Sequence, residues 1–206
     1  MTNKNKIIKI AIKLFNAYGT KAITTNHIAK EAKISPGNLY YHFKNKIDII
    51  RSILDNFNSD LDSIFNIQLD TISDFSKNII SLYNHFFQIQ KSYQFLFIEG
   101  VYLIKQDKIL LDNYAIFRTQ IKKDYQKLLT DLVNIKILKK NTLNIINDLL
   151  ETQWIILWYW INHSILDRKI YDDFQIKKGI KLSFSIIEPH LTPLGKVEFD
   201  KTLKVL

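Results

Sequence analysis

The sequence predicts an all-α fold, and three observations lead to that prediction. Apolar residues recur along most of the chain at intervals of three and four, the period of a helix with one buried face. The 206 residues include only five Gly and three Pro, so long helices with few turns are expected. No segment shows the apolar–polar alternation of a half-buried strand, and we find no internal repeat.

The first two helices are indicated by their spacing and by their ends. The buried face of the first is formed by Ile7, Ala11, Leu14, Phe15 and Tyr18. Gly19 follows and is expected to end this helix, since glycine is the usual residue after a helix C-terminus. Thr24 and Thr25 offer an N-cap for a short second helix that runs through Ala32.

The third helix is brief, and the fourth is long. Ser35 is a good N-cap, and Pro36 suits the first helical position because its missing N–H is not needed there. This helix is expected to end near Lys44, and Asn45 caps the next one, with Asp48 in its first turn. The apolar stripe of the fourth helix consists of Ile50, Ile53, Leu54, Phe57, Leu61, Ile64 and Phe65.

The rest of the chain is also expected to be helical. Further helices are predicted at about residues 73–90, 93–105, 109–135, 143–166 and 172–191, with a weak one after Gly195. Pro189 is expected to bend the helix at 172–191 or to end it early. Because the fourth helix has no linker residue, the boundary between a domain at 1–51 and a domain at 52–206 is expected inside that helix.

Positive charge is concentrated at the start of the chain. Residues 1–51 hold nine Lys and Arg51 against Glu31 and Asp48, an excess of eight, while the remainder holds 19 basic and 18 acidic residues. A surface of this kind attracts a polyanion, and nucleic acid is the first candidate. The alternative is a solvated lysine face with no partner.

Composition argues against several other classes of protein. The absence of Cys excludes disulfides and thiolate metal sites and favours the cytoplasm. The longest apolar run, residues 154–161, is too short to span a membrane. His163 and Asp167 have helical spacing but no third ligand in view, so we predict no metal site. No phosphate loop, nucleophile or paired carboxylate is found, so we predict neither an enzyme nor a cofactor.

The helix at 35–44 has an outer face suited to a DNA groove. Leu39 and Phe43 share one side of a helical wheel, which we expect to be buried. The other positions are Gly37, Asn38 and Tyr41 opposite them, with Tyr40 and His42 on the flanks. Asn can pair with an adenine edge, while Tyr and His can donate to phosphates, as can Lys46 in the next helix. The alternative is an ordinary turn with half-buried aromatic packing.

The segment TTNHIAKEAKISPGNLYYHFKNKIDII, residues 24–50, resembles the helix-turn-helix of TetR-type bacterial transcriptional regulators. The resemblance implies an N-terminal three-helix DNA-binding domain joined through a long helix to an α-helical ligand-binding and dimerisation domain. The residues expected to bind DNA are Thr25, Asn26, Ser35, Gly37, Asn38, Tyr40, Tyr41, His42 and Lys46. The chain departs from the family at Lys33, where glycine is usual, and a left-handed lysine there would cost on the order of 1 kcal/mol.

Two further sites are expected after residue 52. The aromatic residues that could line an apolar pocket are Tyr83, Phe86, Phe87, Phe97, Tyr102, Phe117, Trp154 and Trp158. Each of them could instead belong to an ordinary core. The resemblance also implies a homodimer held by the last two long helices, for which we predict an interface at Ile176, Ile180, Ser183, Phe184 and Ile187. Gly179 and Ser183 are small enough for close helix approach, and the alternative is a monomer core.

The sequence therefore predicts a ligand-responsive repressor that binds a palindromic operator in double-stranded DNA as a homodimer. A small hydrophobic or aromatic effector is expected to release it. The alternative is an all-α small-molecule binding protein or enzyme whose basic N-terminus is incidental.

Overall fold

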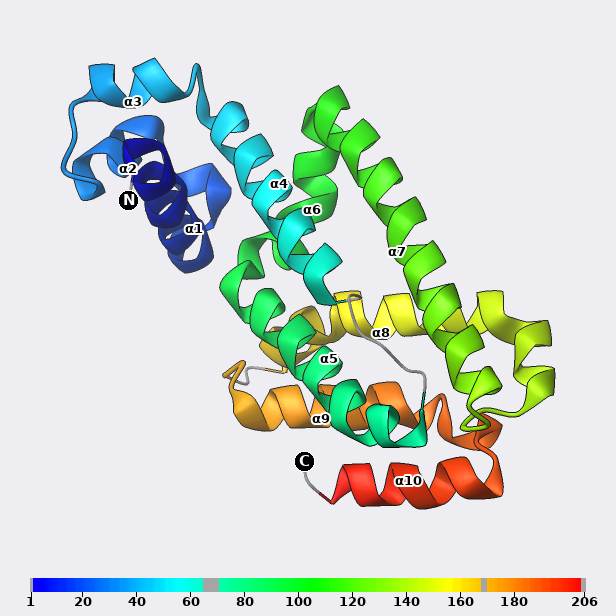
Figure 1. The fold of residues 1–206 in the computed structure, drawn as a ribbon. Helices are drawn as coiled ribbons and strands as arrows, with labels where there is room; N and C mark the ends of the chain where they lie inside the picture. Colours follow the sequence, from blue (N-terminus) through cyan, green and yellow to red (C-terminus); the bar gives the residue numbers. More distant parts are fainter. Residues whose placement is uncertain (1, 65–70, 168–169, 205–206) are drawn as a thin grey trace. The chain divides into compact units, whose positions relative to one another are not determined.

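The computed structural model describes residues 2–64, 71–167 and 170–204, and they form an all-α protein, as predicted (Figure 1). The α-helices are α1 (Asn3–Ala22), α2 (Thr25–Glu31), α3 (Pro36–His42), α4 (Lys46–Ile64), α5 (Ile72–Ser92), α6 (Gln94–Gln106), α7 (Lys108–Asn134), α8 (Ile146–Leu166), α9 (Asp173–Ser185) and α10 (Pro193–Leu203). Two 3₁₀ helices, η1 (Lys140–Ile145) and η2 (Glu188–His190), precede α8 and α10. Within these ranges the only β pairing is an isolated bridge between Leu138 and Leu191. None of the described helices combines the length and apolar character that a bilayer span requires.

The chain divides into two compact units. Unit 1 comprises Met1–Asp60 and Ser92–Ala115, and unit 2 comprises Leu61–Lys91 and Ile116–Leu206. Helices α4 and α7 each begin in unit 1 and end in unit 2, so a boundary does fall inside the fourth helix. It falls nine residues later than the expected division after residue 51, and unit 1 also contains α6. Phe65, the last residue expected in the α4 stripe, lies outside the described residues.

The helix starts of unit 1 use the caps that the sequence offered. The side chain of Thr24 accepts a hydrogen bond from His27 N (3.3 Å), and His27 Nδ1 accepts one from Thr24 N (3.3 Å). Ser35 Oγ accepts from Asn38 N (3.1 Å) at the start of α3, and Asn45 Oδ1 accepts from Asp48 N (3.0 Å) at the start of α4. These bonds satisfy backbone donors that a helix leaves unpaired in its first turn.

The sequence predicted that α1 ends at Gly19, but in the structure Gly19 kinks the helix. Its φ of 76° lies in the left-handed region, and helical residues continue to Ala22. Beyond the kink, both carboxylate oxygens of Glu99 accept hydrogen bonds from Thr20 N at 3.1 and 3.2 Å, and Glu99 also binds the Thr20 hydroxyl. The left-handed φ favours glycine here, and a Cβ on Gly19 would also lie 2.7 Å from Glu99 Oε1, so the carboxylate would have to shift.

Helix α6 is fastened to α1 and α4 within unit 1. Asn16 Nδ2 donates to Ser92 O (2.7 Å), and Asn16 Oδ1 accepts from Phe95 N (3.1 Å). Arg51 of α4 forms an ion pair with Asp107 just after α6, with Nη2 2.7 Å from Oδ2. These bonds hold α6 at both of its ends.

Helices α8 and α9 of unit 2 pack side by side, and a small residue allows their close approach (Figure 1). A Cβ on Gly179 would lie 2.7 Å from the Trp160 ring and 2.8 Å from Phe87. Trp160 Nε1 also donates to Gln175 O (2.8 Å), which joins the two helices. Gly179 therefore does allow a close helix approach, but within the chain rather than at the dimer interface for which it was expected.

The later helix boundaries differ from those expected. Helix α9 ends at Ser185 rather than at about residue 191. Pro189 explains the early end, because its nitrogen cannot donate to Ser185 O and its ring would collide with that carbonyl. Helix α8 begins at Ile146, three residues late, because the six preceding residues form η1. The weak helix expected near Gly195 is α10.

Replacing Gly19 with Ala is expected to lower the free energy of unfolding by about 1–3 kcal/mol, because a left-handed Cβ must also displace Glu99. Urea unfolding followed by circular dichroism measures the change. Gly37→Ala is the matched control, since Gly37 lies in a helix with an ordinary φ and a Cβ there would approach only Ser35 Oγ, at 3.9 Å. That control should keep or gain stability by up to about 1 kcal/mol. Equal effects of the two substitutions would contradict this description of the kink.

Candidate DNA-binding surface and ligand cavity

The outer face of α3 carries exposed aromatic and polar groups. Its inner anchors are buried, with Leu39 fully enclosed and Phe43 4% exposed. Tyr41 is 84% exposed and Tyr40 is 51% exposed, so neither contributes much to the core. The wheel therefore predicted the buried side of α3 correctly, and the alternative of half-buried tyrosine packing fails for Tyr41.

Hydrogen bonds arrange several of the predicted DNA-binding side chains. The hydroxyls of Thr25 and Tyr40 lie 3.0 Å apart, which joins the start of α2 to α3. Asn38, predicted at the centre of the outer face, is only partly exposed, and its Oδ1 accepts from Asn3 Nδ2 (3.3 Å). Asn26, Ser35 and Gly37 are also exposed, and the Tyr41 ring packs edge-on against the His42 ring.

Lys46 has a structural role that the sequence did not reveal. Its ammonium donates to Thr20 O (2.7 Å) and to Ile23 O (2.9 Å), and so binds carbonyls at the end of α1. An ammonium has three N–H groups, so one donor is left for a further acceptor. The expected phosphate contact of Lys46 stays a prediction.

The turn between α2 and α3 is left-handed at Lys33, a conformation that is unfavourable for a lysine. Lys33 has φ 54°, in the left-handed region, and its N–H donates to Lys30 O (3.1 Å). The adjacent Ile34 N donates to Ala29 O (3.1 Å), which closes the turn. The conformation expected where the family has glycine is therefore present, and the chain tolerates a lysine in it.

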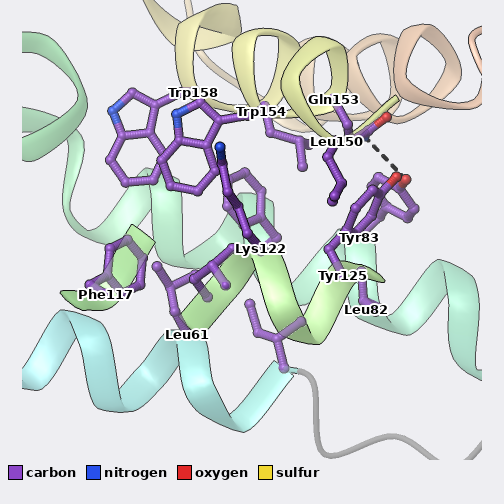
Figure 2. Close-up of a pocket in the computed structure, with 14 residues that line it drawn as sticks. Leu61, Leu82, Tyr83, Phe117, Lys122, Tyr125, Leu150, Gln153, Trp154 and Trp158 are labelled. Carbon is purple, nitrogen blue, oxygen red and sulfur yellow. Dashed lines mark hydrogen bonds between the residues drawn. The ribbon is translucent and has the colours of Figure 1, made fainter. Parts of the chain in front are cut away.

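An apolar cavity lies within unit 2 (Figure 2). Its lining comes from Leu61, Ile64, Leu82, Tyr83, Phe86, Phe117, Ile121, Lys122, Tyr125, Leu150, Gln153, Trp154, Leu157 and Trp158. The indoles of Trp154 and Trp158 stack side by side (Figure 2), with ring centres 4.6 Å apart and 11° between their planes. The centre of the Phe117 ring lies 6.3 Å from the centre of each indole. The free volume is about 50 Å³.

Five of the eight aromatic residues predicted for a pocket line this cavity, and three do not. Phe87 is fully buried against the contact of α8 with α9, close to Gly179. Phe97 belongs to unit 1 and packs edge-on against Phe57, with ring centres 5.7 Å apart. Tyr102, also in unit 1, is 54% exposed. Phe87, Phe97 and Tyr102 are therefore corrections to the predicted lining.

A chain of polar groups, missed in the sequence, enters the apolar lining. Gln153 is buried and its Nε2 donates to the Tyr83 hydroxyl (3.1 Å), as the dashed line in Figure 2 shows. The Tyr83 hydroxyl is also hydrogen-bonded to that of Tyr125. Burial raises the pKa of Tyr83 and of Tyr125, so both phenols stay neutral. Oε1 of Gln153 has no hydrogen-bond partner.

Charged groups stand beside the tryptophans. Arg118 Nη2 lies 2.7 Å from Glu151 Oε2, and its guanidinium is 5.6 Å from the centre of the Trp154 ring. Lys122, the one charged residue in the lining, binds the other oxygen of Glu151. The hydrogen bond from Lys122 lowers the pKa of Glu151, and Arg118 adds to this effect. Two cations share one carboxylate, which leaves a net positive charge.

The five residues predicted for a dimer interface lie inside the chain. Ile176, Ile180, Ser183, Phe184 and Ile187 are each 7% exposed or less. They pack into the core of unit 2, where Phe184 contacts Tyr83 and Phe199, so they cannot reach a partner. The exposed large apolar side chains on the described parts of the same helices are Ile155, Tyr159, Ile165 and Leu166 on α8 and Phe174 and Leu182 on α9.

Nε2 of His163 lies 3.6 Å from Oδ2 of Asp167. Within the described ranges, no group of three or more His or acidic side chains is arranged to hold a metal ion.

Comparisons with known proteins agree with this geometry. The family "Bacterial regulatory proteins, tetR family" matches residues 7–53, and the family "Bacterial transcriptional repressor" (TetR) matches residues 56–199. The transcriptional regulator QacR of Staphylococcus aureus is 46% identical over 54 residues, which cover 26% of this chain and 29% of QacR. The chain thus matches less than a third of the length of such curated relatives.

Solved structures match nearly the whole chain. A TetR-family transcriptional regulator from Marinobacter aquaeolei VT8 aligns with a TM-score of 0.88 and 27% identity, over 99% of this chain and 98% of that one. SmeT in complex with triclosan aligns with a TM-score of 0.66 and 13% identity, over 94% and 93% of the two chains. At that identity the second match concerns the fold alone.

Proposed function

Because the chain belongs to the TetR family of bacterial transcriptional regulators, we propose that it is a repressor whose effector site is the cavity of unit 2. In this proposal a homodimer binds a palindromic operator in double-stranded DNA and leaves it when a small hydrophobic or aromatic effector enters the cavity. The protein acts in the cytoplasm, with its target DNA, and we propose no catalytic role for it. The observation that carries the proposal is the exposed polar face of α3 within the strongly basic first quarter of the chain.

Different side chains of this face suit different parts of DNA. In the Thr25–Tyr40 pair, one hydroxyl donates to the other, and the hydroxyl that accepts keeps its own proton to donate to a phosphate, which fixes the position of the protein on the duplex. Asn38 can replace its hydrogen bond to Asn3 with a bidentate pair to an adenine edge. Lys46 can give its third N–H to a phosphate while it continues to bind the end of α1.

A palindromic operator requires two copies of α3, and the exposed side of α8 and α9 supports a second copy as the partner. Ile155, Tyr159 and Leu166 follow one another at intervals of four and seven along α8 and are between 54% and 72% exposed. Phe174 of α9 is 69% exposed. Apolar side chains in such a row are covered in a stable protein, and a two-fold axis lets two identical rows cover each other.

Helix α4 supplies a route from the effector to the DNA. Its last turns contribute Leu61 and Ile64 to the cavity, while Lys46 at its start binds the end of α1. A ligand that displaces Leu61 or Ile64 therefore acts on α4, the helix whose Lys46 binds the end of α1 and is proposed to contact a phosphate. A coupling of about 1–3 kcal/mol is typical of such linked sites. SmeT, which shares the fold, has been solved with triclosan, and we extend binding of an aromatic ligand to this chain as a proposal.

The first test compares Asn38→Ala with Lys46→Met on two DNAs, a duplex selected from a random pool by the protein itself and an unrelated duplex. Asn38→Ala should lose about 1–3 kcal/mol on the selected duplex and little on the other, because it removes a base contact. Lys46→Met should weaken both equally and reduce the salt slope by about one, because it removes a phosphate contact. Fluorescence anisotropy over a salt series measures all four affinities.

Asn3→Ala is the control for Asn38, since it breaks the same hydrogen bond but leaves the proposed base contact in place. It should preserve the preference for the selected duplex. An equal loss on both DNAs for Asn38→Ala would transfer the base contact to Tyr41 or Asn26. A salt slope that Lys46→Met does not change would make Lys46 purely structural.

The second test concerns the dimer. Ile155→Asp should convert a homodimer into a monomer of 24.4 kDa at micromolar concentration, because it places an unpaired charge within the proposed interface. Sedimentation equilibrium measures the mass. Val101→Asp is the matched control, since Val101 is 70% exposed on α6 in unit 1, and this variant should remain dimeric. A wild-type monomer, or an Ile155→Asp variant as dimeric as the wild type, would move the interface elsewhere.

A further inference from the structure

Among the described residues that line the cavity, Gln153 carries a fully buried polar atom that lacks a hydrogen-bond partner. This side chain is 1% exposed, and its Nε2 is used on the Tyr83 hydroxyl. Oε1 is left without a hydrogen bond in a side chain that lines the cavity. Buried acceptors are nearly always satisfied in folded proteins, so an unsatisfied acceptor on a residue that lines the proposed effector site points to a donor on the ligand. Both tyrosine hydroxyls nearby are already hydrogen-bonded.

Charge limits the ligand further. Of the residues that line the cavity only Lys122 is charged, and its ammonium is bound by Glu151, which also binds Arg118. A cation would meet this net positive charge and would find no carboxylate in the lining. An ionised group of either sign would also lose its water on entering an apolar space.

Shape and size favour a flat ring. The stacked indoles of Trp154 and Trp158, with Phe117 beside them, give an aromatic wall on which a ring can pack. The free volume of about 50 Å³ is smaller than the roughly 150 Å³ that accommodates benzene in an apolar cavity. A two-ring ligand must therefore displace side chains, and Leu61 and Ile64 of α4 are among those that surround it.

We propose, on the basis of the proposed effector site, that the effector is an uncharged aromatic compound whose single hydroxyl or similar group donates a hydrogen bond to Oε1 of Gln153. The aromatic wall supplies most of the affinity. The hydrogen bond to Gln153 supplies the selectivity between compounds of the same shape. Cationic aromatic compounds are excluded.

The test uses three probes that share one naphthalene ring system: 2-naphthol, 2-methoxynaphthalene and a naphthylammonium-type cation, the 2-naphthyltrimethylammonium ion. Calorimetry on the full chain at pH 7 should show that naphthol binds about tenfold more tightly than its methyl ether, the factor of one net hydrogen bond, and that the cation does not bind. Equal affinities of naphthol and the ether would overturn the proposal, as would no binding of naphthol or binding of the cation as tight as that of the ether.

Two variants locate the effect. Gln153→Met keeps the length of the side chain but removes the acceptor, so naphthol and the ether should bind it with similar affinity. Gln90→Met is the matched control, because Gln90 is equally buried but outside the cavity lining, with Nε2 bonded to Leu157 O (2.8 Å) and Oε1 bonded to the Tyr171 hydroxyl. It should lose stability and keep the preference for naphthol. A preference that survives in Gln153→Met would refute the assigned acceptor.

A DNA titration on the same samples separates this inference from the proposed function. If naphthol binds selectively but the wild-type chain does not bind DNA at low salt, the ligand class stands and the regulatory role fails. If the chain binds DNA but does not distinguish naphthol from its ether, the regulatory role stands and the ligand class fails.

Discussion

The C-terminal end of α1 is bound to α4 and α6 by two charged side chains, and this contact joins the DNA-binding helices to the rest of unit 1. Glu99 of α6 accepts from the Thr20 N–H and hydroxyl, and Lys46 of α4 donates to the carbonyls of Thr20 and Ile23. Hydrogen bonds to charged groups are about twice as strong as those between neutral groups. The left-handed Gly19 makes room for the carboxylate. Any movement of α4 or α6 relative to α1 must strain or break these bonds.

The local features of the first 60 residues follow from short-range rules, which is why the sequence predicts them well. Caps at Thr24 and Ser35 and the buried side of α3 depend on neighbouring residues and on two apolar anchors. The hydrogen bonds of Glu99 to Thr20 were not predicted, because the two residues are 79 positions apart in the sequence. Lys46 was assigned to phosphate for the same reason, since its carbonyl partners are more than 20 residues away.

The second half shows what periodicity cannot distinguish. An apolar stripe shows that a helix face is covered, but it does not say whether the cover is the same chain or a second copy. The stripe through Ile180 and Phe184 is covered by the chain itself, whereas Ile155 and Tyr159 lie on a helix that is apolar nearly all round and are exposed. Gln153 was not predicted as a site residue, because a single polar residue among apolar neighbours has no sequence signature. In the structure it carries an unpaired acceptor in the lining of the cavity.

In the proposed function, ligand binding in the cavity and DNA binding at α3 are linked, and such linkage is reciprocal. The most direct measurement is a pair of titrations on the wild-type chain with a compound that calorimetry shows to bind. One gives the affinity for the selected duplex with and without the saturating compound, and the other gives the affinity for the compound with and without saturating duplex. We predict that both affinities fall by one common factor, about 5- to 150-fold. An affinity for DNA that the bound compound leaves unchanged would contradict it.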